Sequence, residues 1–420
     1  MNKPALLRPS WSRFVLLFAA LGMGLGACDE TSEMEISTTE VAPPLSQKER
    51  AGQLAQEIII ADTHIDVPYR VAEKMEDIST RTEGGDFDYP RAKEGGLNLA
   101  FMSIYVPADH QGTGDAKDVA DRLIDIVEKF TADWPDKFAI ATSAADVRQQ
   151  FAQGKISLAL GMENGAPIET LEDLLHFYNR GIRYITLTHS KVNQLSDSSF
   201  DANRQWNGLS PLGKEVVAEM NRLGIMVDVS HISDEAFYQV IALSTAPVIA
   251  SHSSSRHFTP GFERNMSDTM IQKLGENGGS IDINFGSSFL VDSIRQGEMG
   301  IWKYFQENKV RPDSDEGKEY VQRYREKTGL GYADVSDVMA HVDRAVKLAG
   351  VDHVGLGSDF DGVGDSLPTG LKDVSFYPNL IYELLKKGYS EEDIAKICAG
   401  NVLRVWSEVE RRAEELQASE

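Results

Sequence analysis

The feature that most constrains the fold is a repeated alternation of two sequence patterns. Short apolar runs rich in β-branched residues, typical of strands, alternate with segments whose apolar residues recur every three or four positions, as in helices. Eight strand-like runs are present, at residues 57–64, 97–106, 156–163, 182–189, 225–231, 247–252, 280–285 and 353–359. Helical periodicity fills residues 122–134, 144–152, 171–179, 213–223, 234–243, 268–276 and 335–349. Strands that alternate with helices form parallel sheets, so the pattern predicts an α/β fold, a (β/α)8 TIM-type barrel with insertions.

Residues that typically end or begin helices agree with this predicted alternation of strands and helices. Gly181, Gly224 and Gly350 stand where a helix should stop before the next strand. Residues 289–330, rich in charge and aromatic rings, interrupt the alternation and predict an insertion after the seventh strand. From residue 378 the pattern is helical, with Ser390 as an N-cap, which predicts a C-terminal helical extension. We expect residues 49–420 to form a single barrel domain.

The first 28 residues have a different composition. Lys3, Arg8 and Arg13 precede an apolar segment over residues 14–27 that has the shape of a signal-peptide core. Its end, Leu25-Gly26-Ala27-Cys28, resembles the lipobox of bacterial lipoproteins, in which Cys28 is lipidated and becomes the first mature residue. We therefore expect a lipoprotein signal peptide over residues 1–28, with a plain secretory signal as the alternative. The protein is then exported and anchored by lipid to a bacterial cell membrane, on the periplasmic or extracytoplasmic face.

Residues 29–48 are rich in Asp, Glu, Ser and Thr and predict a flexible tether. Removal of residues 1–28 takes away three basic and no acidic side chains, so the formal net charge moves from −23 to −26. Such an acidic surface argues against nucleic-acid binding and against adhesion to anionic lipid. The one cysteine after Cys28 is Cys398, which lies in an apolar stretch and is expected as a buried core residue.

The carboxyl ends of the predicted strands carry metal-binding side chains. His64 and Asp66 are two residues apart at the first strand, so they leave the strand on the same face. The other strand ends carry Glu163, His189, His231, His252 and Asp359. Four of the nine histidines thus close predicted strands, at the rim where barrel enzymes place their chemistry. A set of ordinary surface histidines has no reason to gather there.

Imidazole and carboxylate ligands without thiolate suit two borderline divalent ions, most simply zinc. Two such ions roughly 3.5–4 Å apart can share a carboxylate and a hydroxide, and the hydroxide can attack an amide carbonyl. A carboxylate not fully committed to metal is still needed to move the proton to the leaving amine. Asp359 is the candidate, in preference to Asp361 of the same parity, because it is nearer the strand.

Ordered motifs around these positions resemble the membrane, or renal, dipeptidases (peptidase family M19) over residues 50–412. The motifs are Asp62-Thr63-His64-Ile65-Asp66, Gly161-Met162-Glu163-Asn164-Gly165, Leu187-Thr188-His189, Asp228-Val229-Ser230-His231, Ser251-His252-Ser253, Arg264-Asn265, Gly357-Ser358-Asp359-Phe360-Asp361-Gly362, Gly370-Leu371-Lys372-Asp373-Val374 and Asn401-Val402-Leu403-Arg404-Val405. The resemblance implies a zinc-dependent dipeptidase that hydrolyses free dipeptides through a metal-bridging hydroxide, with two zinc ions per chain. It also implies a possible homodimer, since dimers are usual in the family.

The resemblance also implies roles for single residues. His64, Asp66 and Glu163 would hold one zinc ion, and Glu163 would bridge to the second, which His231 and His252 complete. His189 would contact the substrate and the tetrahedral intermediate. Arg264 would bind the terminal carboxylate of the substrate, and Asp359 would bind substrate and shuttle the proton. One departure is Asn164, which stands where the family often has Gly.

Two alternatives remain open from the sequence. The first is a binuclear metal amidohydrolase acting on another small or cyclic amide, such as a lactam, because fold and metals do not define a substrate. Related barrel amidohydrolases often bridge their metals with a modified Lys, and no Lys closes a predicted strand here, which favours the dipeptidase. The second is an anchored protein that binds peptide or metal without turnover, against which the complete ligand set argues.

Overall fold

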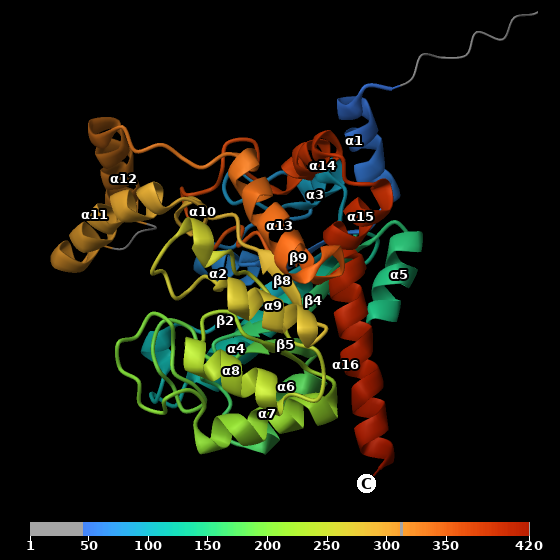
Figure 1. Cartoon of the computed structure of the whole chain (residues 1–420), viewed down its shortest axis with the longest axis vertical. Helices are drawn as coiled ribbons and strands as arrows, with labels where there is room; N and C mark the ends of the chain where they lie inside the picture. Colours follow the sequence, from blue (N-terminus) through green and yellow to red (C-terminus); the bar gives the residue numbers. More distant parts are fainter. Residues whose placement is uncertain (1–44, 311–313, 420) are drawn as a thin grey trace, which may run out of the picture. The chain divides into compact units, whose positions relative to one another are not determined.

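Eight parallel strands lie side by side in a nearly closed barrel, in the order β1-β2-β4-β5-β6-β7-β8-β9 (Figure 1). The computed structural model describes residues 45–310 and 314–419. The strand bounds are β1 Ile60–Ile65, β2 Leu97–Tyr105, β3 Phe138–Ile140, β4 Ile156–Glu163, β5 Ile182–Thr186, β6 Met226–Asp228, β7 Ile249–Ala250, β8 Ser280–Ile283 and β9 Val354–Leu356. Ile65 of β1 forms a parallel bridge with Phe360, which follows β9 in the chain, so the last strand returns to the first and the predicted (β/α)8 barrel is confirmed.

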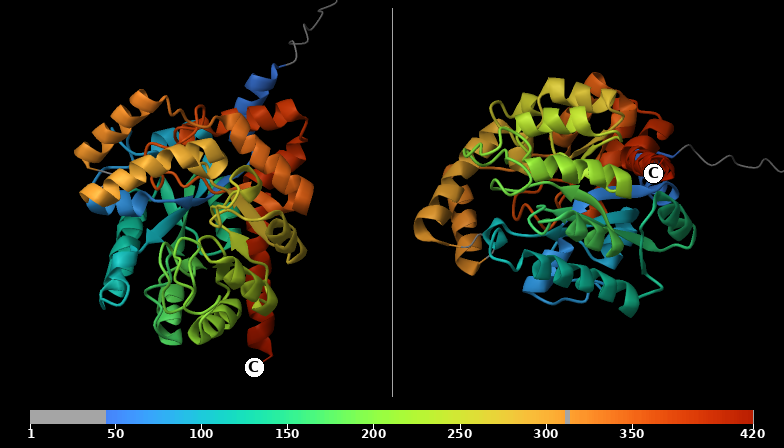
Figure 2. Two further views of the ribbon diagram at one scale, coloured as in Figure 1. Left: turned by 60° about the vertical axis from the view of Figure 1, so that its left-hand side comes forward. Right: turned by 90° about the horizontal axis from the view of Figure 1, so that it is seen from below.

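The helices lie outside the strands in both views of Figure 2. Their bounds are α1 Gln47–Glu57, α2 Val67–Glu73, α3 Tyr89–Gly95, α4 Ala116–Asp133, α5 Ala144–Ala152, α6 Leu171–Asn179, α7 Pro211–Leu223, α8 Asp234–Leu243, α9 Asp268–Glu276, α10 Ser287–Leu290, α11 Asp292–Asn308, α12 Asp315–Thr328, α13 Val335–Ala349, α14 Tyr377–Lys387, α15 Glu391–Ala395 and α16 Asn401–Ala418. Five predicted helices have these bounds to the residue, and the other two begin two to six residues earlier than predicted. Gly224 caps α7 at a φ of 87°, as its position in the sequence predicts.

The sequence pattern missed the strand β3 and the helices α1, α2 and α3, among other short elements. The extra strand β3 has only three residues, and it pairs with the first part of β4, which β5 reaches only from Leu160 onward. Helices α2 and α3 have only seven residues each, and α1 buries only Ala51, Leu54 and Ala55, so the helical periodicity of all three is weak. The predicted first strand also began three residues too early, because Glu57 is the last residue of α1.

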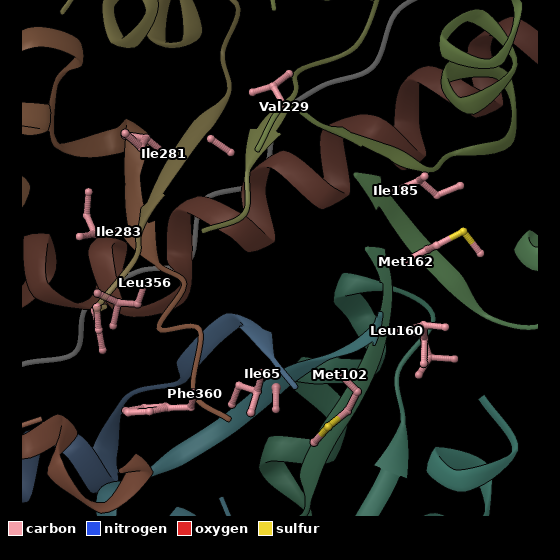
Figure 3. Close-up of a cluster of buried hydrophobic side chains, with 14 of the residues drawn as sticks. Ile65, Met102, Leu160, Met162, Ile185, Val229, Ile281, Ile283, Leu356 and Phe360 are labelled. Carbon is pink, nitrogen blue, oxygen red and sulfur yellow. The ribbon is translucent and has the colours of Figure 1, made fainter. Parts of the chain in front are cut away.

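Apolar side chains fill the space between the strands and the surrounding helices. Figure 3 shows part of this core, with Ile65, Met102, Met162, Ile185 and Ile283 among the labelled residues. All of them are fully buried, as expected for residues of parallel strands that alternate between the helix layer and the barrel interior. Cys398 belongs to the same core, as predicted.

The C-terminal extension packs against the amino ends of the strands. Trp406 of α16 is fully buried, with its ring 5.2 Å from that of Phe101, and the Phe101 ring is 5.4 Å from that of Tyr184. Ser390 caps α15 by accepting a hydrogen bond from the Asp393 amide, as predicted, and a π-helical segment, η5 Lys396–Gly400, connects α15 to α16. The opposite end of the barrel, where the strands end, is therefore left for the functional site.

The predicted insertion forms the helices α10, α11 and α12, of which α11 and α12 extend outward in Figure 1. Arg325 of α12 donates hydrogen bonds to Glu298 of α11 at 2.6 Å and to the Asp365 carbonyl at 3.0 Å. The insertion is thereby attached to the loop that follows β9.

The predicted signal peptide, with Cys28, and almost all of the predicted tether lie outside the described residues. Gln47 and Lys48, the last two residues of that tether, belong to α1, whose N-cap Ser46 forms a capping box with Glu49. From Leu45 onward the chain forms one compact unit. None of the helices in the described ranges has both the length and the apolar composition needed to cross a membrane.

One carboxyl group inside the barrel gives a pH prediction. Asp282 of β8 is fully buried; its Oδ1 accepts a hydrogen bond from Ser280 Oγ at 2.6 Å, and its Oδ2 has no partner among the described residues. Burial raises the pKa of Asp282 to about 8, against about 3.9 in an unfolded chain. Between these values the folded protein holds one more proton than the unfolded chain, so its stability falls as pH rises.

We expect this group to lower the free energy of unfolding by up to about 1.4 kcal/mol per pH unit between about pH 4 and pH 8. Asp282→Asn should flatten that part of the profile, because an amide does not titrate. Urea unfolding of metal-free protein at about pH 5.5, 7 and 8.5 measures the difference. Equal slopes for the wild type and the variant would contradict the prediction.

Candidate metal centre

Glu163, the last residue of β4, lies between two groups of potential ligands. Its Oε2 is 3.5 Å from His64 Nε2, and Asp66 Oδ2 is 3.4 Å from the same nitrogen. Its Oε1 is 3.1 Å from His231 Nε2 and 3.4 Å from His252 Nε2. The five residues come from four strands or the loops directly after them, and all are buried. One carboxylate thus faces two separate groups of ligands with its two oxygens.

Three overlapping sets of ligand atoms each lie within 4.8 Å of one another. They are His64 with Glu163 and His252, Glu163 with His189 and His231, and His64 with Asp66 and Asp359. A single ion needs about four ligands. The structure therefore brings together enough side chains for two ions, and it brings together every strand-end residue that the sequence singled out.

The donor set fits divalent cations. His64 Nε2 and Asp66 Oδ1 are buried and have no hydrogen-bond partner among the described residues, although buried polar atoms are normally paired. The Nε2 atoms of His231 and His252 are only 2.9 Å apart. Burial, helped by the charge of Arg264, lowers the pKa of both imidazoles well below the usual value, so both are neutral. Neutral imidazole is the form that binds a metal ion.

Glu163 is held in its ionised form. Burial raises its pKa, but the four surrounding imidazoles, those of His189, His64, His231 and His252, outweigh burial and hold the pKa well below its usual value. A bridging carboxylate must be ionised to share its two oxygens.

The strands end earlier than the sequence pattern predicted. His189, His231 and Asp359 lie three residues beyond the ends of β5, β6 and β9, and His252 lies two beyond β7. The chain is in turn or loop conformation at these four residues. His231 and Asp359 take the left-handed region, with φ of 69° and 65°. Such a backbone costs a non-glycine residue on the order of 1–3 kcal/mol and is typical of functional sites.

Asn164 also has a positive φ, 76°, which explains why glycine suits this position in the resembling family. Its side chain donates to the Val106 carbonyl at 2.8 Å and accepts a hydrogen bond from Asn193 Nδ2 at 3.0 Å. Asn tolerates the left-handed region better than most residues, so the departure from Gly leaves the loop next to Glu163 intact.

His189 lies beside the metal ligands. Its Nε2 is 3.5 Å from Glu163 Oε1, and its ring packs edge to face with that of Tyr105 at 4.9 Å. Its Nδ1 has no partner among the described residues. The side chain is also about one fifth exposed, more than those of the five ligands, which is compatible with contact to a substrate.

The structure separates Asp359 from Asp361. Asp359 lies with His64 and Asp66, and it accepts a hydrogen bond from Asn284 Nδ2 on Oδ2 at 2.7 Å. Burial raises its pKa to about 7. The charge of His64 opposes this rise, and the charges of Asp66 and Glu163 add to it. Asp361 instead accepts from the Asp86 amide and lies 3.2 Å from Arg70 Nε. Of the two aspartates, Asp359 is the one at the centre.

Arg264 lies in the loop after β7 and is almost completely buried. It donates to Ser253 Oγ at 2.6 Å and to the His252 carbonyl at 2.7 Å, and its Nε has no partner among the described residues. Burial lowers its pKa to about 10, so it remains charged at neutral pH. A buried guanidinium whose hydrogen bonds go only to neutral groups is suited to bind an anionic group from outside the chain.

Two strands that gave no candidate from the sequence also reach the centre. Tyr105 ends β2, and Asn284 is the first residue after β8. The rule that barrel enzymes place functional residues at the carboxyl ends of their strands applies to both positions. They were missed because only metal-ligating side chains were sought there, whereas a phenol and an amide act by hydrogen bonding and packing.

Comparison with known proteins agrees with the geometry. The sequence model of the membrane dipeptidase family (peptidase family M19) matches residues 48–420. The probable dipeptidase PvdM from Pseudomonas aeruginosa is 29% identical, with a TM-score of 0.77 over 87% of this chain and 99% of that one. Dipeptidase AC, a metallopeptidase of family M19, is 27% identical, with a TM-score of 0.70 over 84% and 98% of the two chains.

A third similar structure is a metallopeptidase from Rhodobacter sphaeroides bound to a phosphinate mimic of the dipeptide L-Ala-D-Ala. It is 27% identical, with a TM-score of 0.69 over 84% of this chain and 99% of that one. The family model matches almost the whole described chain. The three alignments also cover almost the whole length of each similar structure. The chain belongs to the membrane dipeptidase family, peptidase family M19, and is thus a metal-dependent hydrolase that acts on dipeptides.

Proposed function

We propose that this protein is a zinc-dependent dipeptidase that hydrolyses the peptide bond of free dipeptides at a centre of two zinc ions. The observation that carries the proposal is the position of Glu163, with one carboxylate oxygen toward His64 and the other toward His231 and His252. Imidazole and carboxylate donors without thiolate are a ligand set that suits zinc.

In this proposal His64 and Asp66 would hold one ion, His231 and His252 would hold the other, and Glu163 would serve both. When bound, the ions supply Lewis acidity that polarises the scissile carbonyl and activates a water molecule at neutral pH. The protein contributes the arrangement of ligands and the exclusion of bulk water, because the ligands are buried.

Arg264 gives the substrate its orientation. Its planar, permanently charged guanidinium is suited to the terminal carboxylate of a dipeptide. Its position between the His252 carbonyl and Ser253 fixes it close to the metal ligands. Binding of the terminal carboxylate here sets how far the scissile bond lies from the chain end, which selects short peptides.

Asp359 and His189 act on the reacting atoms. Asn284 occupies Oδ2 of Asp359, so Oδ1 is the oxygen that accepts a proton from the water and gives it to the leaving amine. A pKa of about 7 suits a group that must both take up and release a proton near neutral pH. His189, one fifth exposed beside Glu163, is placed to contact the substrate carbonyl and the tetrahedral intermediate.

Metal removal and a substrate panel test the proposal together. We expect chelator treatment to abolish hydrolysis of free dipeptides and stoichiometric zinc, near two ions per chain, to restore it. Because Arg264 needs a free carboxylate, dipeptides with a C-terminal amide should lose at least about 100-fold in kcat/KM. L,L and L,D dipeptides belong in the panel, since one relative binds a mimic of L-Ala-D-Ala.

Other results would point to other functions. Hydrolysis that survives complete chelation would contradict a metal mechanism. Equal turnover of free and amidated dipeptides, or preferential turnover of a lactam, would favour the amidohydrolase alternative. Tight zinc binding without turnover of any dipeptide would favour a binding protein.

The proposal extends to location. Residues 1–28 have the charge pattern and apolar core of a signal peptide ending in a lipobox, so we propose that Cys28 is lipidated and anchors the enzyme to the cell membrane. In a bacterial expression host, the wild type should fractionate with membranes and incorporate radiolabelled palmitate, whereas Cys28→Ser should do neither. Labelling of both proteins or of neither would contradict the anchor. The homodimer stays a prediction.

A further inference from the structure

We propose that Asp228 is a positioning residue for the metal centre, which acts through the hydroxyl of Ser251 to fix the tautomer and ring orientation of His252. The inference rests on the metal centre of the proposed function and not on its substrate. It concerns a chain of three buried residues on β6 and the loop after β7, of which only His252 belongs to the proposed set of metal ligands.

Asp228, the last residue of β6, is fully buried and accepts four hydrogen bonds. Its Oδ1 accepts from the amides of Ser230 at 3.0 Å and Ser251 at 2.9 Å. Its Oδ2 accepts from Ser251 Oγ at 2.7 Å and from the hydroxyl of Thr186. Only an ionised carboxylate offers acceptors to all four donors, since a protonated one would present a hydrogen to one of them.

The hydroxyl of Ser251 has one hydrogen, which it donates to Asp228. It is also 2.7 Å from His252 Nδ1. Because its hydrogen is already used, Ser251 can only accept here, so His252 must carry its proton on Nδ1. The lone pair of His252 is then on Nε2, the nitrogen that lies 3.4 Å from Glu163 Oε1, and is free to bind a metal ion.

The other imidazoles of the centre have no such support. His64 Nδ1 is 2.8 Å from the hydroxyl of Tyr184, a group that can donate or accept and so leaves the tautomer open. His231 Nδ1 has no hydrogen-bond partner among the described residues. Among these three ligands, His252 alone is linked to a carboxylate through its Nδ1 in the described part of the chain. Outer partners of this kind orient ligands and raise their basicity.

A plain structural role for the same contacts must be separated from positioning. The bond from Ser251 to Asp228 also ties the loop after β7 to β6, and its loss would lower stability whether or not metal is bound. Ser280 provides a matched control, because its hydroxyl donates to the buried carboxyl group of Asp282 at 2.6 Å in the same barrel. Neither Ser280 nor Asp282 forms a side-chain hydrogen bond to a ligand imidazole among the described residues.

The experiment compares wild type, Ser251→Ala, Asp228→Asn and Ser280→Ala. Zinc dissociation constants are measured by competition with a chromophoric chelator, and unfolding of the metal-free proteins is measured in urea. We expect Ser251→Ala and Asp228→Asn to weaken zinc binding about 10-fold to 100-fold. Ser280→Ala should leave affinity unchanged. Equal affinities for Ser251→Ala and Ser280→Ala would overturn the proposal.

A second measurement is made on the wild type and needs no bound metal; a variant serves only to assign the signal. Nitrogen-15 NMR of histidine-labelled, metal-free wild type reports which ring nitrogen of His252 carries the proton, with assignment from His252→Gln. We expect the proton on Nδ1, and a proton on Nε2 would overturn the proposal. If dipeptide turnover fails while the Nδ1 proton and the affinity difference are found, the proposed function falls and the positioning role stands.

Discussion

Replacement of Glu163 by Gln is expected to remove dipeptidase activity and most of the bound metal. The carboxylate faces His64 with one oxygen and both His231 and His252 with the other. An amide nitrogen is a poor metal ligand, so the Glu163→Gln variant would leave one side of the centre without a bridging donor. We expect kcat/KM to fall by on the order of 10⁴-fold or more, since metal activation and its accompanying proton transfer are lost together. Metal analysis and dipeptide turnover measure the two effects.

Glu298→Gln is the matched control for this variant. Glu298 is also a buried glutamate, paired with Arg325 at 2.6 Å, but it lies in α11 and takes no part in the clusters of potential ligands. The control should lose stability and keep its metal. A Glu163→Gln variant with two ions and turnover within about 10-fold of the wild type would show that Glu163 is no bridge.

Asp359→Asn is expected to keep both metal ions and to lose about 100-fold to 10,000-fold in kcat, the usual contribution of a general acid and base. The amide has nearly the shape of the carboxylate, and its oxygen can still accept the hydrogen bond from Asn284. It cannot carry the proton from the water to the leaving amine. Steady-state kinetics with metal analysis of the same sample measures the separation between chemistry and metal binding.

Asp361→Asn serves as the comparison for Asp359→Asn. Both aspartates are buried, both have a φ of 65°, and burial raises both pKa values to about 7. Because Asp361 faces Arg70 and Asp86, its replacement should change stability more than kcat. If the Asp361 variant lost turnover and the Asp359 variant kept it, the assignment of the proton carrier would be wrong.

Much of the fold follows from local pattern. Five helices match their predicted bounds to the residue, because each combines a cap with an apolar stripe, as Ser267 does for α9 and Ser233 for α8. Helix α1 was not predicted because its apolar face is small, although Ser46 and Glu49 have the spacing of a capping box in the sequence. The three-residue strand β3 has too few residues to show any period.

The gathering of the ligands was also predictable, because parallel strands in a barrel bring all their carboxyl ends to one rim. The strand-end rule does not say which oxygen of Glu163 faces which histidine. It favoured Asp359 over Asp361 only because Asp359 is nearer the strand, whereas the structure separates the two aspartates by their contacts. Gly362 shows that such contacts depend on single residues, since a Cβ there would lie 2.2 Å from Asp359 Oδ1 and 2.3 Å from Asp66 Oδ2. The backbone must pass this close for the two carboxylates to meet.

The sequence alone determined the barrel, its approximate element bounds and the kinds of side chain at its rim, because strand period, helix period and caps act over a few residues. Tertiary structure decided the contacts between residues far apart in the chain. Asn284 binds Asp359 across 75 residues, and Tyr184 reaches His64 across 120. Such contacts depend on where loops turn at the rim and on backbone conformations such as those of His231 and Asp359, which no local period encodes.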